Sequence, residues 1–188
     1  MQTEATERYL HSFGKYVVQQ ARSNLTKAGK SDSKGLYNSI KYEVVRDGDN
    51  FILEFYMLSY GKFVDKGVSG SKKTQNYKNW EGRNIPSPYK FGTGSSLVGK
   101  SKGGMSGIMS KWVARKGFQW RDKETGKFMS HKSMGYIIAR SIYSKGIKSI
   151  SFFQRPIELG LKTFGQDLLD NVAKDLIDTV NNQSTTTE

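Results

Sequence analysis

The spacing of apolar residues predicts two long amphipathic helices, one near each end of the chain. In residues 5–27, apolar side chains recur three or four positions apart, at Leu10, Phe13, Val17, Ala21 and Leu25. The same spacing returns after Pro156, a residue that suits a first helical turn, at Leu161, Phe164, Leu168, Val172, Leu176 and Val180. An apolar stripe on an otherwise polar helix needs a second element to cover it, so both helices are expected to pack.

Between these helices, apolar and polar residues alternate in two short runs. Ile40, Tyr42 and Val44 alternate with Lys41 and Glu43. In the second run, apolar residues at positions 51, 53, 55 and 57 alternate with a mixed face that contains Glu54 and Tyr56. The runs are separated by Asp-Gly-Asp-Asn at residues 47–50, a sequence that tolerates positive φ. The pattern predicts a β-hairpin. Its exposed edge is a natural place for strand addition by another subunit.

The periodic pattern is lost over residues 61–107. This stretch holds 10 of the 20 glycines and two of the three prolines. Connections of this length without secondary structure are generally functional or disordered. We therefore expect residues 68–105 to be mobile and to order mostly on assembly.

Shorter elements are predicted after this stretch. They are a helix over 107–116, a second and smaller hairpin around 122–126, a helix over 133–144 stopped by Gly146, a strand over 147–153, and a frayed polar tail at 183–188 that ends the polar run from 181.

This order of elements predicts an α+β fold. A small antiparallel sheet would be packed by the N-terminal helix and the long C-terminal helix. From its length, we expect the chain to form a single domain over residues 1–188. Residues 68–132 form within it a long basic Gly- and Lys-rich insertion with a short helix and a hairpin.

The net charge of +13 is concentrated in the middle of the chain. Residues 1–61 carry a net charge of +1, residues 62–155 carry +16 and residues 156–188 carry −4. Charge at this density is unfavourable unless counter-ions or a polyanion screen it. The middle segment is therefore expected to meet an acidic partner.

Composition excludes several classes of site. The chain has no cysteine, which rules out disulfides, thiolate metal sites and cysteine nucleophiles, and two histidines cannot build a multi-histidine metal site. It has no apolar run of about 20 residues and no pattern of a secretory signal. We expect a soluble protein of the cell interior, or of something assembled there, without a membrane span.

One segment matches a phosphate-binding motif literally. Gly94-Ser-Ser-Leu-Val-Gly99-Lys100-Ser101 fits G-x-x-x-x-G-K-[ST], which needs a buried strand before it and a helix after it. The preceding residues 86–91 are broken by proline, and Gly103-Gly104 opposes the helix. We interpret the match as a chance one, and nucleotide hydrolysis stays a third-ranked hypothesis.

No other group is a candidate for catalysis. His11 and His131 lack a Ser, Asp or Glu at a spacing typical of a triad or a metal pair. The acidic residues Asp167, Asp170, Asp175 and Asp178 lie on the polar side of the predicted last helix, as a solvated face would. We therefore expect a protein that is not an enzyme and that has no catalytic residue, cofactor or metal.

The basic middle segment is the main candidate for a binding surface. Aromatic residues are interleaved with its cations: Tyr77, Trp80, Tyr89, Phe91 and Trp112. Mobile cations neutralise phosphates, and aromatic faces stack on bases or on protein. The candidate contact residues are Lys72, Lys73, Lys78, Arg83, Lys90, Lys100, Lys102, Lys111, Arg115 and Lys116.

Two interpretations of this segment remain open. It is either a solvated loop kept soluble by its charge, or a surface that contacts DNA or an acidic protein neighbour. The chain shows no helix-turn-helix, zinc-finger or RNP motif, so nothing indicates base-specific recognition.

Three segments, in this order, resemble phage tail-completion and head–tail joining (neck) proteins. Tyr60-Gly-Lys-Phe63-Val64-Asp65-Lys-Gly67 is similar to their aromatic-x-x-aromatic-Val-acidic-x-Gly segment. Ala139-Arg140-Ser-Ile142-Tyr-Ser-Lys-Gly146-Ile147 resembles the helix and glycine before their final strand. Phe152-Phe153-Gln-Arg-Pro156 resembles the Phe-x-x-Pro start of their last helix. The resemblance covers residues 5–67 and 133–182, and residues 68–132 are longer and more basic than the family's middle loop.

The resemblance implies a structural virion protein that forms a homo-oligomeric ring at the neck or tail, next to portal, neck or tail proteins. Such a chain would be assembled in the host cytoplasm and would have no enzymatic activity. A ring repeats one basic surface around an axis, so the cations would face double-stranded DNA in a channel or an adjoining ring. The alternative is a free, non-sequence-specific nucleic-acid-binding protein.

Overall fold

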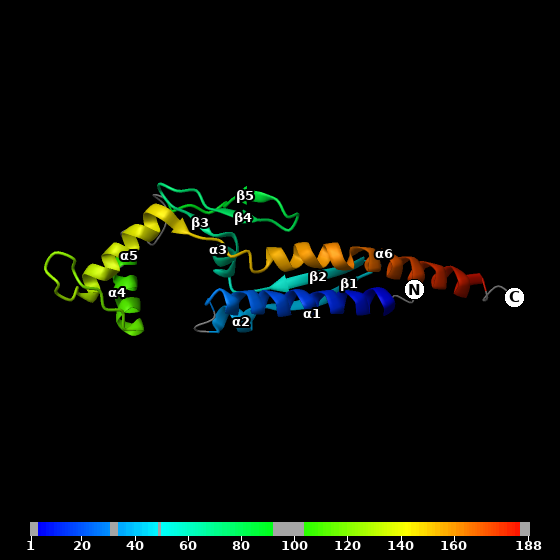
Figure 1. Ribbon diagram of the computed structural model, residues 1–188. Helices are drawn as coiled ribbons and strands as arrows, with labels where there is room; N and C mark the ends of the chain where they lie inside the picture. The colour runs from blue at the N-terminus through cyan, green and yellow to red at the C-terminus, as the bar shows by residue number, and fades with distance from the viewer. Residues whose placement is uncertain (1–3, 31–33, 49, 92–103, 185–188) are drawn as a thin grey trace. The chain divides into compact units, whose positions relative to one another are not determined.

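The protein has an α+β fold in the computed structural model, which describes residues 4–30, 34–48, 50–91 and 104–184 (Figure 1). Over these residues helices dominate, and the strands form antiparallel pairs of two. The fold class predicted from the sequence is confirmed.

The chain divides into two compact units. The first unit comprises Met1–Asp65, Lys78–Ile85 and Ile150–Glu188. The second unit comprises Lys66–Tyr77 and Pro86–Ser149. Each unit is therefore assembled from segments that are distant in the sequence.

In the first unit, two long helices pack together and a hairpin lies against one of them. Helix α1 (Glu4–Lys27) contacts helix α6 (Gln154–Ser184) along its length, and it also contacts strands β1 (Lys41–Asp47) and β2 (Asn50–Tyr56) (Figure 1). The N-terminal helix, the C-terminal helix and the hairpin expected from the sequence are all confirmed.

The hairpin has the register that its turn sequence predicts. Asp47 pairs with Asn50 and Lys41 with Tyr56, which leaves two residues between the strands. Gly48 has a φ of 60°, as the favoured two-residue turns require. This register directs Tyr42 and Phe55 towards the core and the next residue of each strand away from it.

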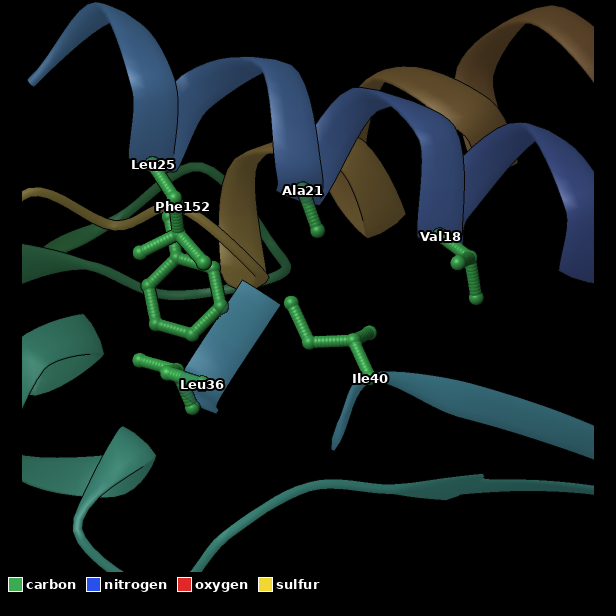
Figure 2. Close-up of a cluster of buried hydrophobic side chains, with 6 residues drawn as sticks. All are labelled: Val18, Ala21, Leu25, Leu36, Ile40 and Phe152. Carbon is green, nitrogen blue, oxygen red and sulfur yellow. The ribbon is translucent and has the colours of Figure 1, made fainter. Parts of the chain in front are cut away.

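The core of the first unit lies where α1, a short helix and the residues before α6 meet. Its buried side chains are Val18, Ala21, Leu25, Leu36, Ile40 and Phe152, which Figure 2 shows pointing towards one another. Leu36 belongs to the short helix α2 (Gly35–Ser39), which directly precedes β1. Tyr42, Phe55, Met57 and Phe153 pack around this cluster.

Only part of the apolar stripe of α6 is covered, contrary to the sequence prediction. Phe164 lies among the rings of Tyr9, Phe13 and Tyr16 on α1, with centroid distances of 5.3–6.2 Å. Leu161 and Val172, which the periodicity assigned to the packed stripe, are exposed. Helix α1 covers only part of the apolar face of α6 that the periodic pattern predicts.

Helix α6 is also longer than predicted at both ends. It begins at Gln154, two residues before Pro156, and continues through Ser184. The frayed tail predicted at 183–188 is therefore helical at 183–184, and residues 185–188 lie outside the described residues.

In the second unit, helices α4 (Gly104–Lys116) and α5 (His131–Lys145) pack closely against each other. Both were predicted, and each begins two or three residues before its predicted start. Gly135 allows the close approach, because a Cβ there would lie 2.5 Å from the Ser110 nitrogen. Val113, Met134 and Ala139 are buried in this unit.

The segment predicted to lack structure contains several short elements. They are helix α3 (Gly61–Lys66), β3 (Val68–Ser69), β4 (Asn76–Lys78) and β5 (Asn84–Pro86). Strand β4 pairs with β5, and β3 pairs with β6 (Gly146–Ile147). The prediction of a mobile loop over 68–105 is thus wrong for 68–91, where long-range hydrogen bonds replace the missing periodicity, and for 104–105, which begin α4. Residues 92–103 lie outside the described residues.

Two smaller predictions are met only in reduced form. The strand expected over 147–153 is limited to β6, since Ser151 takes a φ of 45° and the chain turns there into α6. The second hairpin consists of one antiparallel bridge between Arg121 and Phe128, with Met129 N–H donating to the Trp120 carbonyl at 2.8 Å.

Candidate nucleic-acid or partner interface

The net positive charge of the chain lies in the second unit. The sequence of that unit has 16 basic and two acidic residues, a net charge of +14. The first unit has 14 basic and 15 acidic residues, a net charge of −1. A polyanion would therefore be attracted to one unit and not to the other.

Lys72 and Lys73 are exposed on a loop that hydrogen-bonds to the C-terminal end of α5. The Ser71 and Lys72 amides donate to the Tyr143 and Ser144 carbonyls at 2.9 and 3.0 Å. The last carbonyls of a helix have no partner within the helix, so this loop satisfies them. It requires Gly70, where a Cβ would lie 2.1 Å from the Ser144 oxygen.

Lys90 is held on the same unit by a bridge to β3. The Ser69 amide donates to the Tyr89 carbonyl at 2.7 Å, and the Phe91 amide donates to the Ser69 carbonyl at 2.9 Å. The Lys90 side chain is exposed between these two bonds. A backbone held on both sides gives this cation a defined position.

Three further candidates lie near the end of α4. Lys111 and Arg115 are one helical turn apart and share a face, and Lys116 is the last helical residue. All three side chains are exposed. Cations in the last helical turn also interact favourably with the helix dipole.

The candidate residues do not all belong to one unit. Lys78 and Arg83 belong to the first unit, on the β4–β5 hairpin, and the Arg83 guanidinium is paired with Glu81. Lys100 and Lys102 lie outside the described residues, as does the Gly94–Ser101 motif. Of the candidates in the second unit, the described ones are Lys72, Lys73, Lys90, Lys111, Arg115 and Lys116.

Only some of the aromatic residues expected to stack are exposed: Trp80 is 51% exposed and belongs to the first unit. Tyr77 and Phe91 are buried, so they support the fold and present no face to a partner. Trp112 is half-buried against Phe118, with the two ring centroids 5.2 Å apart. In the second unit the exposed rings are Phe118, Trp120, Phe128 and Tyr136, all later in the chain than the interleaved segment.

The second unit also exposes basic residues that the predicted set does not include. The second unit exposes seven more basic residues after α4: Arg121, Lys123, Lys127, Lys132, Arg140, Lys145 and Lys148. The charge count over 62–155 included them, but the candidates were restricted to the glycine-rich segment and α4. Lys132, Tyr136 and Arg140 follow one another at i, i+4 spacing, so they share one face of α5.

Two segments that carry the family resemblance meet in the first unit. Asp65 is buried, and its Oδ1 accepts hydrogen bonds from the Phe153 and Gln154 amides at 2.8 and 3.4 Å. The Ser151 amide donates to the Asp65 carbonyl at 3.0 Å. This carboxylate holds the start of α6, so its role here is structural.

No protein family, curated protein or solved structure matches this chain. Among the described residues, no helix has the length and apolarity to cross a membrane. In that same part of the chain, no group of three or more His, Asp or Glu side chains is placed to hold a metal ion.

The two histidines belong to different units. His11 stacks edge-on against Tyr42, with ring centroids 5.9 Å apart, and His131 is the exposed first residue of α5.

A shallow groove of about 310 Å³ follows the seam between α1 and α6, where burial and the charge of Asp167 raise the pKa of Tyr9. The Tyr9 hydroxyl donates to the Phe164 carbonyl, which fastens the two helices together.

Proposed function

We propose that this chain is a structural virion protein of a bacteriophage. In this proposal it forms a homo-oligomeric ring at the neck or tail, next to portal, neck or tail proteins, and is assembled in the host cytoplasm. The second unit contacts double-stranded DNA in the channel or an adjoining ring. The chain acts by assembly and needs no catalytic residue.

The observation that carries this proposal is the unequal charge of the two units, +14 against −1. A near-neutral unit can pack against copies of itself without strong repulsion, whereas a highly cationic unit needs a polyanion or an acidic surface nearby. Repetition around a ring axis would turn each cationic unit into one part of a positively charged collar. The resemblance of residues 5–67 and 133–182 to neck proteins agrees with this arrangement.

The alternative is a free nucleic-acid-binding protein without sequence preference. The same charge favours it, together with the exposed Trp120 and Phe128 rings among cations. It differs from the first proposal in needing no oligomer.

Two measurements on the full chain separate these functions. Light scattering should find a discrete ring, or a monomer that assembles on a partner, for the virion protein; the alternative predicts a monomer that shifts only on DNA. Duplex binding should weaken steeply as salt rises, with a log–log slope of roughly −0.9 per neutralised phosphate. A chain that neither self-assembles nor binds duplex DNA or a neck partner would overturn both functions.

A further inference from the structure

The outward face of the β1–β2 hairpin exposes apolar side chains. Val45 and Ile52 are directly opposite each other in the register and are 39% and 44% exposed. Tyr56, on the same face, is 46% exposed. A cross-strand apolar pair stabilises a sheet when it is covered, and here both members face solvent.

The same face carries an unfavourable pair of charges. Glu43 is directly opposite Glu54, and both side chains are exposed. Like charges directly opposite on one face destabilise a hairpin. Strand alternation also places Asp47 and Lys41 on this face, so its net charge is negative. A partner for this face should therefore present both apolar and cationic groups.

The second unit presents that combination between α4 and α5. We call residues 117–130 the basic tip. Its exposed aromatic side chains are Phe118, Trp120 and Phe128. Its cations Arg121, Lys123 and Lys127 are exposed and outnumber its two acidic residues, Asp122 and Glu124, for a net charge of +1. The Arg121 guanidinium lies 4.6 Å from the Phe128 ring centroid, so cationic and aromatic groups are adjacent.

The basic tip has a defined conformation. Asp122 Oδ1 accepts hydrogen bonds from the Thr125 amide at 2.8 Å and the Glu124 amide at 3.1 Å. The Gly126 amide donates to the Asp122 carbonyl at 2.9 Å, and Arg121 bridges to Phe128. A surface that is already ordered loses little conformational entropy when it binds.

We propose that the basic tip of one copy docks on the outward face of the β1–β2 hairpin of a second copy. Aromatic side chains of the tip cover Val45 and Ile52, and Arg121 and Lys123 separate and neutralise Glu43 and Glu54. DNA is excluded from this face because its carboxylates repel phosphate. The inference rests on the proposed ring, for which it names the subunit contact.

This contact joins two different surfaces, so it is heterologous. Each copy then has one tip and one hairpin face to offer, and copies add head to tail. Such contacts close into a ring when the rotation between copies permits, and otherwise extend as a filament.

Charge reversal tests the contact in the full chain. Glu43→Lys with Glu54→Lys should weaken self-association on the order of a hundredfold, because like charges then face each other. Arg121→Glu with Lys123→Glu should do the same. The chain that carries all four substitutions should regain association, because the ion pairs are restored in the opposite sense. Analytical ultracentrifugation over a concentration series gives the association constant, and circular dichroism checks that each variant is folded.

A matched control uses the other acidic surface of the first unit. Asp167→Lys with Asp170→Lys makes the same change in net charge on the exposed side of α6 and should leave association unchanged. Equal weakening by this control would overturn the contact, because it would show an effect of net charge alone.

The remaining outcomes separate this inference from the proposed function. If the wild type assembles and the hairpin reversals change nothing, the contact is wrong and the ring stands. If the wild type stays monomeric at every concentration, the contact is also wrong, and duplex or partner binding then decides the function by itself.

Discussion

Asp65 shows how one buried residue joins distant parts of the first unit. Its carboxylate accepts hydrogen bonds from the Phe153 and Gln154 amides, which lie 88 and 89 positions later in the chain. These amides precede or begin α6, and no earlier turn of the helix can satisfy them. Asp65, the acidic residue of the 60–67 segment, therefore holds the start of α6 in place.

Replacing Asp65 should destabilise the first unit. Asp65→Ala leaves two amides without their acceptor and is expected to cost about 0.5–2 kcal/mol, the range measured for removal of helix caps. Asp65→Asn keeps one oxygen acceptor and should cost less. Urea unfolding measures both changes, with the exposed Asp167→Ala, expected within about 0.5 kcal/mol of the wild type, as the control. An Asp65→Ala chain as stable as this control would contradict the anchoring role.

Tyr56 should titrate at unusually high pH. The hydrogen bond that its hydroxyl donates to Glu54 is the main cause that raises its pKa to about 12, and burial and the charges of Glu54 and Glu43 add to it. Glu54→Gln should lower this pKa towards the ordinary value of about 10, and Glu43→Gln should lower it less. Phenolate absorbance, as the difference between each chain and its Tyr56→Phe counterpart, measures the shift.

The same shift has a defined sign for stability. Because the pKa of folded Tyr56 lies above its unfolded value, the hydrogen bond stabilises the fold below about pH 10. Its contribution disappears as the pH rises from about 10 to about 12. A wild-type Tyr56 that titrates near 10 would contradict the bond to Glu54.

At the residue scale, the sequence predicted charge better than exposure. The cations on α4 are exposed as expected, since a charged side chain is rarely buried without a partner. Tyr77 and Phe91 were expected at the binding surface and are buried. An aromatic ring suits a core and a stacking surface equally well, so composition cannot assign it to either.

At the element scale, periodicity located the long helices and the β1–β2 hairpin because their contacts repeat along the sequence. It missed α3, β3, β4 and β5, which have two to six residues each. These short elements are held by bonds to distant residues, such as the Ser69 amide on the Tyr89 carbonyl. The residue pattern within one segment does not indicate which distant residues it will bond to.

Two helical glycines should respond oppositely to alanine. At Gly135 on α5 a Cβ would lie 2.5 Å from the Ser110 nitrogen, so Gly135→Ala should separate α4 from α5 and cost about 1–3 kcal/mol. At Gly165 on α6 a Cβ meets nothing within 4 Å, so Gly165→Ala should stabilise the helix by about 0.5–1 kcal/mol.

Hydrogen exchange distinguishes the two effects by location. Gly135→Ala should reduce amide protection in α4 and α5 and leave α1 unchanged. Gly165→Ala should increase protection in α6. Equal protection of α4 and α5 in the wild type and in Gly135→Ala would show that the helices do not approach closely at this position.

At the scale of the whole molecule, the fold class was predictable but the two units were not. The second unit combines Lys66–Tyr77 with Pro86–Ser149, so no single stretch of sequence marks its limits. The range of excess positive charge, residues 62–155, contains the whole second unit, but it also includes Lys78 and Arg83, which belong to the first unit.

Removing cations from the second unit alone should reduce DNA binding. Lys111→Gln, Arg115→Gln and Lys116→Gln together should make the log–log salt slope shallower by up to roughly 0.9 for each phosphate that is no longer neutralised. The control replaces Lys15, Lys27 and Lys174, three exposed lysines of the first unit, with glutamine and should leave the slope unchanged. Equal slopes for the two triple variants would mean that DNA does not prefer the second unit.

The pairing of β3 with β6 has a consequence for how this chain can vary. Val68 lies opposite Ile147, so the chain leaves and returns at adjacent points although many residues separate them. Insertions or deletions between these points can alter the intervening loops without displacing either end. Evolution can thus remodel the cationic part of the molecule while the helical scaffold keeps its geometry.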